Sequence, residues 1–202
     1  MFKKTLLVGA VALVASSAAL ADGFYFGAGV GGTGFHDGIS IGGGGGAVDQ
    51  GNLGVIGGLL AGYNFNLANQ FNLGLEAFGN ATSAKISDSD GTTTFTIKSR
   101  YNFGARVLPG YQVTPDTDLH AIVGYVRGQF QENVTVLGVS GSQNLNVNGF
   151  QAGVGSGTNL AKNVALRGDI IYSGYQSITD NFGNQHKFNT LDGIVSVAYK
   201  FG

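Results

Sequence analysis

The sequence predicts an all-β fold: an eight-stranded antiparallel up-and-down transmembrane β-barrel. Eight segments alternate apolar residues with polar or small ones at the period of two that strands show. Charged residues make up only 11% of the chain, against roughly a quarter in typical soluble domains. No segment after the N-terminal leader is apolar for long enough to form a transmembrane helix. A membrane-spanning form of this chain must therefore be a closed barrel, in which every backbone group is satisfied internally.

Residues 1–21 have the pattern of a cleaved secretory signal peptide. Two lysines precede an apolar run from Thr5 to Ala15, and Ala19-Leu20-Ala21 fits an A-x-A cleavage site. The apolar run is shorter than the roughly 20 residues that a spanning helix needs, so we expect cleavage rather than a retained anchor. Residues 22–202 are then predicted to form one outer-membrane β-barrel domain.

The predicted strands follow from this alternation, which is clearest at the C-terminus. From Leu191 to Phe201, one face carries aliphatic and aromatic side chains and the other carries Asp192, Ser196 and Lys200. The apolar face is predicted to meet lipid and the polar face to meet the lumen. The other seven strands are predicted at about Phe24–Val30, Leu53–Phe65, Phe71–Phe78, Phe95–Tyr111, Leu119–Tyr125, Phe150–Val154 and Val164–Tyr172.

The connections between these strands alternate in length. The short ones cover residues 66–70, 114–118 and 161–163, and in this class of protein short turns face the periplasm. The long ones are predicted to be extracellular loops, with the third also interpreted as an extension of the barrel strands. They cover residues 32–52, 80–94, 128–148 and 174–187.

Composition narrows the chemistry further. The chain has no cysteine, so neither disulfides nor thiolate metal sites are predicted. Without the two leader lysines, nine basic residues face twelve acidic ones, giving a formal charge of −3. This near-neutral balance offers no argument for nucleic acid as a partner. We predict no metal and no cofactor.

Four segments give the chain a family resemblance: the signal ending Ala19–Ala21, the opening Gly23–Gly29, the repeat Gly149–Gly155 and the ending Val195–Phe201. They resemble the small outer-membrane β-barrel family that includes the OmpA membrane domain, OmpX and the opacity-type surface antigens. The resemblance implies a place in the outer membrane of a Gram-negative bacterium, in contact with outer-membrane lipid. It also implies that the barrel-assembly machinery reads the C-terminal strand, here through Val195, Val197, Tyr199 and Phe201. Gly202 departs from the terminal Phe that is usual in the family.

Several charged residues fall on lumen-facing positions by parity. An eight-stranded barrel is just wide enough for side chains to fill it, and buried charges must be paired. We therefore expect Glu76 and Asp169 to pair with arginines and to fill the lumen. The alternative is that the network gates a narrow pathway for ions or small solutes. The predicted network is Glu76, Arg100, Arg106, Arg167 and Asp169, with Lys98, His120 and Gln151 on the same face.

The long loops are the predicted working surface, because binding residues tend to lie on loops held by a rigid scaffold. We expect a surface protein with a structural and an adhesin- or antigen-like role, which reaches a host or cell-surface partner through its loops. A lipid-modifying enzyme is the less favoured alternative. The barrel lipid-A deacylases carry a His-x-Ser pair, which His36, His120 and His186 all lack. His36 beside Asp37 is the one local hint of a triad or metal site, and we predict no catalytic residue.

Overall fold

The computed structural model describes residues 23–40, 47–67, 69–89, 93–136, 139–179 and 185–201. The predicted signal peptide, residues 1–21, lies outside these ranges. Within them, no helix is long and apolar enough to cross a membrane. The elements are β1 (Phe24–Ser40), β2 (Ala47–Asn66), β3 (Phe71–Thr82), β4 (Lys85–Ser89), β5 (Thr93–Thr114), β6 (Thr117–Val136), β7 (Val139–Ala161), β8 (Val164–Tyr175), β9 (Ile178–Thr179) and β10 (Gln185–Phe201).

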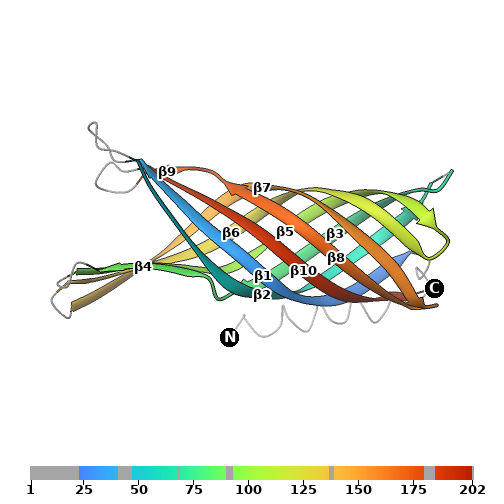
Figure 1. The fold of residues 1–202 in the computed structure, drawn as a ribbon, viewed down its shortest axis with the longest axis horizontal. Helices are drawn as coiled ribbons and strands as arrows, with labels where there is room; N and C mark the ends of the chain where they lie inside the picture. The colour runs from blue at the N-terminus through green and yellow to red at the C-terminus, as the bar shows by residue number, and fades with distance from the viewer. Residues whose placement is uncertain are drawn as a thin grey trace, which may run out of the picture.

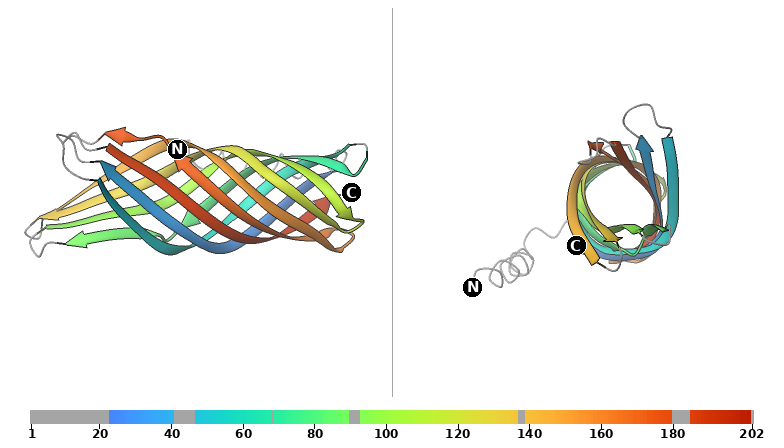
Figure 2. Two further views of the ribbon diagram at one scale, coloured as in Figure 1. Left: turned by 45° about the horizontal axis from the view of Figure 1, so that its top comes forward. Right: turned by 90° about the vertical axis from the view of Figure 1, so that its left-hand side faces the viewer.

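Eight of these strands close into an antiparallel ring in the order β1-β2-β3-β5-β6-β7-β8-β10. The last strand pairs with the first from Phe24↔Phe201 to Ser40↔Gln185, so the ring has no open edge along this seam. Figure 2 shows the closed ring end-on, and Figure 1 shows the strands tilted steeply across it. The two remaining strands extend the wall: β4 pairs with β5, and β9 pairs with β10. The predicted eight-stranded up-and-down barrel is confirmed.

The stagger of the strands decides which lumen residues meet. We follow the directly paired residues from Tyr25 around the ring, one strand at a time. The row returns to β1 at Phe35, ten residues further along that strand than where it started. With eight strands, this stagger leaves an interior that side chains can fill. The row runs Tyr25, Gly62, Glu76, Arg106, Gly124, Gln151, Ser173, Thr190 and Phe35.

The outer surface of the barrel carries the apolar set that parity predicted. Large aliphatic side chains point outward and are exposed in the isolated chain, and Leu53, Val154 and Ile170 are each more than half exposed. Aromatic residues gather toward both ends of this surface. Exposed rings at the end with the short turns are Phe26, Phe65, Phe71, Tyr111, Tyr199 and Phe201, and those at the opposite end are Tyr101, Phe103, Tyr125, Phe150 and Tyr172.

Most of the predicted long loops are in fact strand, and this part of the prediction was wrong. β1 continues to Ser40 and β2 resumes at Ala47, where residues 32–52 were expected to form a loop. The ladder continues beyond the apolar band because its inward side chains, including Phe35, Ile56 and Phe130, still have a core to pack against. The expected extension of the barrel strands within residues 128–148 is confirmed.

The upper parts of β5, β6 and β7, together with β4, form a sheet that stands away from the ring. We call this the projection, and it covers residues 85–89, 93–99, 130–136 and 139–148. Figure 1 shows it at the left-hand end of the molecule, opposite the short turns. Its inward face carries an apolar cluster in which Ile86, Ile97 and Phe130 are buried.

A register shift in β5 corrects a second prediction. The ladder between β5 and β6 slips between Ser99 and Tyr101, which is the signature of a β-bulge. Above the slip, Ile97 and Ser99 face inward and are buried, whereas Lys98 and Arg100 lie on the outer face. The predicted position of Arg100 in the lumen was therefore wrong. One extra residue in a strand reverses the parity of everything beyond it.

Candidate functional site

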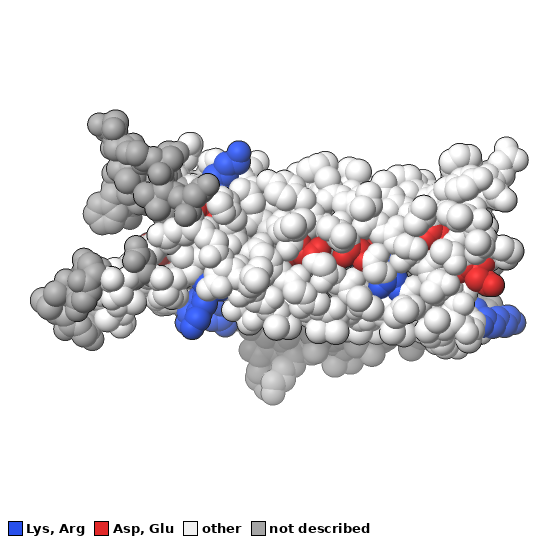
Figure 3. Space-filling view, in the orientation of Figure 1, with Lys and Arg blue, Asp and Glu red and all other residues white. Residues whose placement is uncertain are grey.

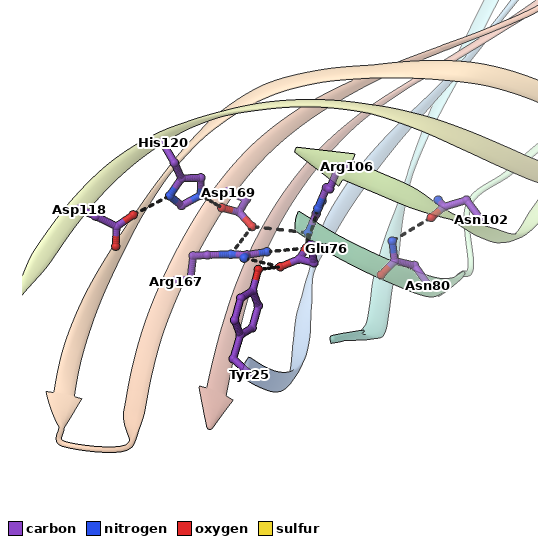
Figure 4. Close-up of polar contacts among 9 residues, drawn as sticks. All are labelled: Tyr25, Glu76, Asn80, Asn102, Arg106, Asp118, His120, Arg167 and Asp169. Carbon is purple, nitrogen blue, oxygen red and sulfur yellow. Dashed lines mark hydrogen bonds and ion pairs between the residues drawn. The ribbon is translucent and has the colours of Figure 1, made fainter. Parts of the chain in front are cut away.

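The lumen is crossed by an ion-pair cluster centred on Glu76 of β3. Glu76 Oε1 accepts a hydrogen bond of 2.6 Å from Arg106 Nε on the neighbouring strand β5. Its Oε2 accepts one of 2.6 Å from Arg167 Nη1, which reaches across from β8, and one of 3.0 Å from the Tyr25 hydroxyl on β1. The carboxylate is buried and receives charge-assisted bonds from two directions, as a buried charge requires (Figure 4).

Asp169 of β8 extends the cluster toward the inner mouth. Its Oδ2 accepts a hydrogen bond of 2.8 Å from Arg167 Nε and lies 4.0 Å from Arg106 Nη2. Its Oδ1 lies 2.9 Å from His120 Nε2, and the other ring nitrogen of His120 lies 3.0 Å from Asp118 Oδ2. Two carboxylates thus face two guanidinium groups in the buried part, and His120 links them to a partly exposed aspartate (Figure 4).

Glycines make room for these contacts. In the ladder, Gly155 lies directly between His120 and Asp169, and a Cβ there would meet Asp169 Oδ1 and His120 Nε2. Gly62 lies in the same way between Tyr25 and Glu76, where a Cβ would meet the tyrosine ring. A residue without a side chain on the middle strand lets two long polar side chains meet across it.

The structure brings four of the five predicted network residues together: Glu76, Arg106, Arg167 and Asp169. Arg100 lies outside the barrel, where its Nη1 donates a hydrogen bond of 2.6 Å to Gln131 Oε1. Tyr25 and Asp118 also belong to the network, although neither was among the predicted residues. Tyr25 lies at a lumen-facing position of the first strand, and Asp118 lies two residues before His120 and therefore on the same face of its strand. The alternation along each strand thus identifies both as lumen-facing residues.

A second barrier, which we call the aromatic plug, closes the lumen toward the projection. Phe35, Phe130 and Phe188 come from β1, β6 and β10 and are each at most 1% exposed. Their ring centroids are 4.6 to 5.9 Å apart, and Tyr175 packs edge-on against Phe130 at 5.1 Å. Separations in this range are typical of attractive aromatic pairs. The plug therefore blocks the lumen by close packing.

Phe78 joins the two barriers. The guanidinium carbon of Arg106 lies 4.9 Å from the centroid of the Phe78 ring, within the range of a cation–π contact. Phe78 also belongs to the apolar cluster that contains the aromatic plug. Charged and apolar layers are thus in contact through one side chain.

Among the described residues, one of the two histidines outside the ion-pair cluster pairs with an aspartate across the β1–β10 seam. Asp37 Oδ2 lies 3.1 Å from His186 Nδ1 across the β1–β10 seam, so the hinted pairing with the adjacent His36 is replaced by a pairing between strands. The His186 ring stacks on Phe188 at 6.0 Å, at the outer side of the plug. In the described part of the chain, no three His, Cys, Asp or Glu side chains gather in a way that could hold a metal ion.

A polar cavity opens at the inner end of the barrel and stops at the ion-pair cluster. The outer part, of about 270 Å³, is lined by amides and charges that include Asn64, Gln112 and Lys162. A narrower part of about 80 Å³ continues to His120 and Arg167. This cavity therefore gives water access from the inner end up to the cluster.

The predicted assembly-signal residues all lie on the outer face of β10. Val195, Val197, Tyr199 and Phe201 are between 38% and 55% exposed, and the rings of Tyr199 and Phe201 pack edge-to-face at 5.0 Å. Phe201 also contacts Phe24 of the first strand at 5.5 Å, where the ring closes. Recognition of these residues by the barrel-assembly machinery stays a prediction.

A family model described as the outer membrane protein beta-barrel domain matches residues 5–201. The chain belongs to this family. Members of the outer-membrane β-barrel family lie in the outer membrane of Gram-negative bacteria, and this barrel is an outer-membrane protein. No curated protein sequence matches the chain.

Three solved structures of other proteins are similar to this family member. The outer membrane protease OmpT from Escherichia coli has a TM-score of 0.55 at 9% identity, covering 90% of this chain and 97% of that one. Neisserial surface protein A has a TM-score of 0.47 at 17% identity, with coverages of 89% and 98%. Ail, the attachment invasion locus protein of Yersinia pestis, has a TM-score of 0.42 at 12% identity, with coverages of 87% and 99%. At these identities the likeness to OmpT bears on the fold alone.

Proposed function

We propose that this outer-membrane barrel is a surface protein with an adhesin- or antigen-like role. In this proposal the closed barrel anchors the projection, and the projection binds extended segments of partner proteins by strand addition. The observation that carries the proposal is an unpaired strand edge on β7. Strand addition to an exposed edge is a recurring way of binding peptides, because the backbone hydrogen bonds of the edge are ready to be used.

The free edge covers residues 140–147 of β7. On one side this segment pairs with β6, from Ser140↔Thr135 to Val147↔Gly128. On the other side, pairing with β8 begins only at Gly149, so the segment has no ladder partner there among the residues that the structure describes. It contains no charged residue and no proline, the features by which proteins usually protect an edge.

The opposite edge of the projection is better protected. β4 is only five residues long and begins with Lys85. The backbone oxygen of Lys85 already accepts a hydrogen bond of 2.7 Å from Asn52 Nδ2. Its side of the sheet therefore offers less to a partner strand than β7 does.

Deleting residues 135–143 tests the proposal. Bacteria that display the wild-type barrel should adhere to a cultured epithelial monolayer, and the deletion should abolish this adhesion while the barrel still folds and migrates as a heat-modifiable band. A Lys162→Ala variant, altered in a turn at the inner end, is the control and should adhere like the wild type. Unchanged adhesion after the deletion would count against the adhesin role.

The lumen supports the anchoring part of this proposal over the alternative of a narrow channel. An ion that entered from the inner mouth would meet the ion-pair cluster and then the aromatic plug. The three phenylalanines of the plug are fully buried. We expect no steady conductance from the wild-type barrel in planar bilayers. A regular single-channel conductance that disappears in a Glu76→Ala or Arg106→Ala variant would favour the gated channel instead.

A further inference from the structure

Four basic side chains gather on the outer face where the projection meets the barrel: Lys85 of β4, Lys98 and Arg100 of β5, and Arg127 of β6. We call them the cationic patch. From this patch we propose that the barrel binds the phosphate groups of a glycolipid in the outer leaflet. Figure 3 shows basic side chains concentrated at the base of the projection on the visible face.

The patch contains a pair of like charges without compensation. Lys85 and Lys98 stand directly opposite each other in the β4–β5 ladder, on the outward face. Like charges at directly opposed positions destabilise a sheet. Neither lysine forms an ion pair with any residue in the described part of the chain. An anion that sits between the two ammonium groups would remove this repulsion.

The bulge in β5 positions the arginine of the patch that lies on this strand. It turns Arg100 outward beside Tyr101, so that two successive residues lie on the same face. Arg100 Nη1 donates to Gln131 Oε1 at 2.6 Å and Nη2 to the Tyr101 hydroxyl at 3.3 Å. The guanidinium also lies 5.5 Å from the centroid of the Tyr101 ring. These contacts hold the group in place, and its other N–H donors remain available for a phosphate.

The face around the patch has a composition that suits an anion. The described side chains next to the patch are hydroxyls and amides, such as Ser87, Thr96 and Gln129. Glu132 stands opposite the inward-facing Ile97, so it belongs to the other face of the sheet. In the described residues, no carboxylate competes with an incoming anion on this face.

The position of the patch points to a lipid as the source of the phosphate. Arg127 stands opposite Phe103 in the ladder and two residues above Tyr125, so the patch borders directly on the outer aromatic belt. Phe103 and Tyr125 are 55% and 52% exposed, and they lead down to the apolar band. A glycolipid can place its acyl chains on that band and its phosphates on the patch, because both surfaces are continuous on β5 and β6. A soluble polyanion would contact only the cationic patch and not the apolar band.

The test uses purified, refolded barrel in detergent and diphosphoryl lipid A as the probe, with a dephosphorylated lipid A for comparison. We expect the phosphorylated form to bind more tightly, and we expect a Lys98→Gln/Arg100→Gln variant to bind it about tenfold more weakly. A Lys162→Gln/Lys187→Gln variant loses the same charge away from the patch and should bind like the wild type. If the first variant does not fold, Lys85→Gln/Arg127→Gln replaces it.

Two results would overturn the proposal. One is equal binding of the phosphorylated and dephosphorylated probes, which would show that only the acyl chains are recognised. The other is equal weakening by the patch variant and the charge-matched control, which would show attraction by net charge. Tighter patch-dependent binding of heparin than of lipid A would assign the patch to a soluble polyanion and would also contradict the proposal. Adhesion through the β7 edge is measured separately, so either proposal can fail alone.

Discussion

The ion-pair cluster and the aromatic plug close the same lumen by different means. The cluster depends on a few directional contacts, with nitrogen–oxygen distances of 2.6 to 2.9 Å around Glu76 and Asp169. The plug depends on the close packing of Phe35, Phe130 and Phe188, with ring centroids 4.6 to 5.9 Å apart. Both layers are buried in a barrel of the same strand number and stagger. The wall sets the space, and the side chains decide how that space is filled.

The two layers should fail differently because of this contrast. Removing one member of a buried ion pair leaves its partner charged and without compensation, so the loss depends on which partner remains. Removing an aromatic ring leaves a cavity, and the loss grows with the volume that the neighbours do not fill. Variants in the cluster should therefore be strongly non-additive, whereas those in the plug should be graded by size.

The largest effect is expected from Glu76→Ala. It leaves Arg106 and Arg167 without their shared carboxylate and should lower the free energy of unfolding by about 3–5 kcal/mol. Urea unfolding in lipid vesicles, followed by circular dichroism, measures this. Asp118→Asn, at the partly exposed end of the network, is the control and should cost much less. Equal losses for the two variants would show that burial of the cluster contributes little.

Phe130→Ala should have the next largest effect. The ring contacts Phe35, Phe188 and Tyr175, and its loss should cost about 3 kcal/mol, at the lower end for such a change because the upper barrel can relax. Phe130→Leu keeps most of the volume and should cost clearly less in the same unfolding experiment. If Phe130→Leu were as costly as Phe130→Ala, ring geometry rather than filled volume would hold the plug together.

A matched pair of glycines tests the spacing within the cluster. Gly155→Ala places a methyl group against the His120–Asp169 contact and should destabilise the barrel by about 1–3 kcal/mol. Gly168→Ala adds the same group where no atom lies within 4 Å, so it should leave the stability nearly unchanged. Similar behaviour of the two variants would mean that the His120–Asp169 contact can be lost or rearranged at little cost.

The smallest effect is expected from Asn80→Ala. Asn80 Nδ2 donates a hydrogen bond of 2.8 Å to Asn102 Oδ1 between β3 and β5 (Figure 4). This neutral bond should contribute about 1 kcal/mol, so its loss should shift the urea midpoint only slightly. The double variant Asn80→Ala/Asn102→Ala leaves no unpaired amide and should cost less than the sum of the single changes. Full additivity would indicate that the two amides act independently.

Period-two alternation predicted the barrel, its strand number and four of the five lumen residues, because parity is a local property of a strand. It failed at Arg100, since a bulge cannot be recognised from residue types alone. It also missed the aromatic plug. Phe35, Phe130 and Phe188 lie beyond the apolar band, in segments whose polar and glycine-rich neighbours favoured loops.

The sequence by itself determined which residues face inward along most of each strand and that the inward charges needed partners. The tertiary structure alone decided which partners meet, because the stagger of the closed ring brings Glu76 opposite Arg167, ninety-one residues away in the chain. It also decided where the ladder ends, which leaves the β7 edge free, and where the bulge turns Arg100 toward the membrane surface. Alternation acts between neighbouring residues, but closure, stagger and edge pairing are properties of the whole sheet.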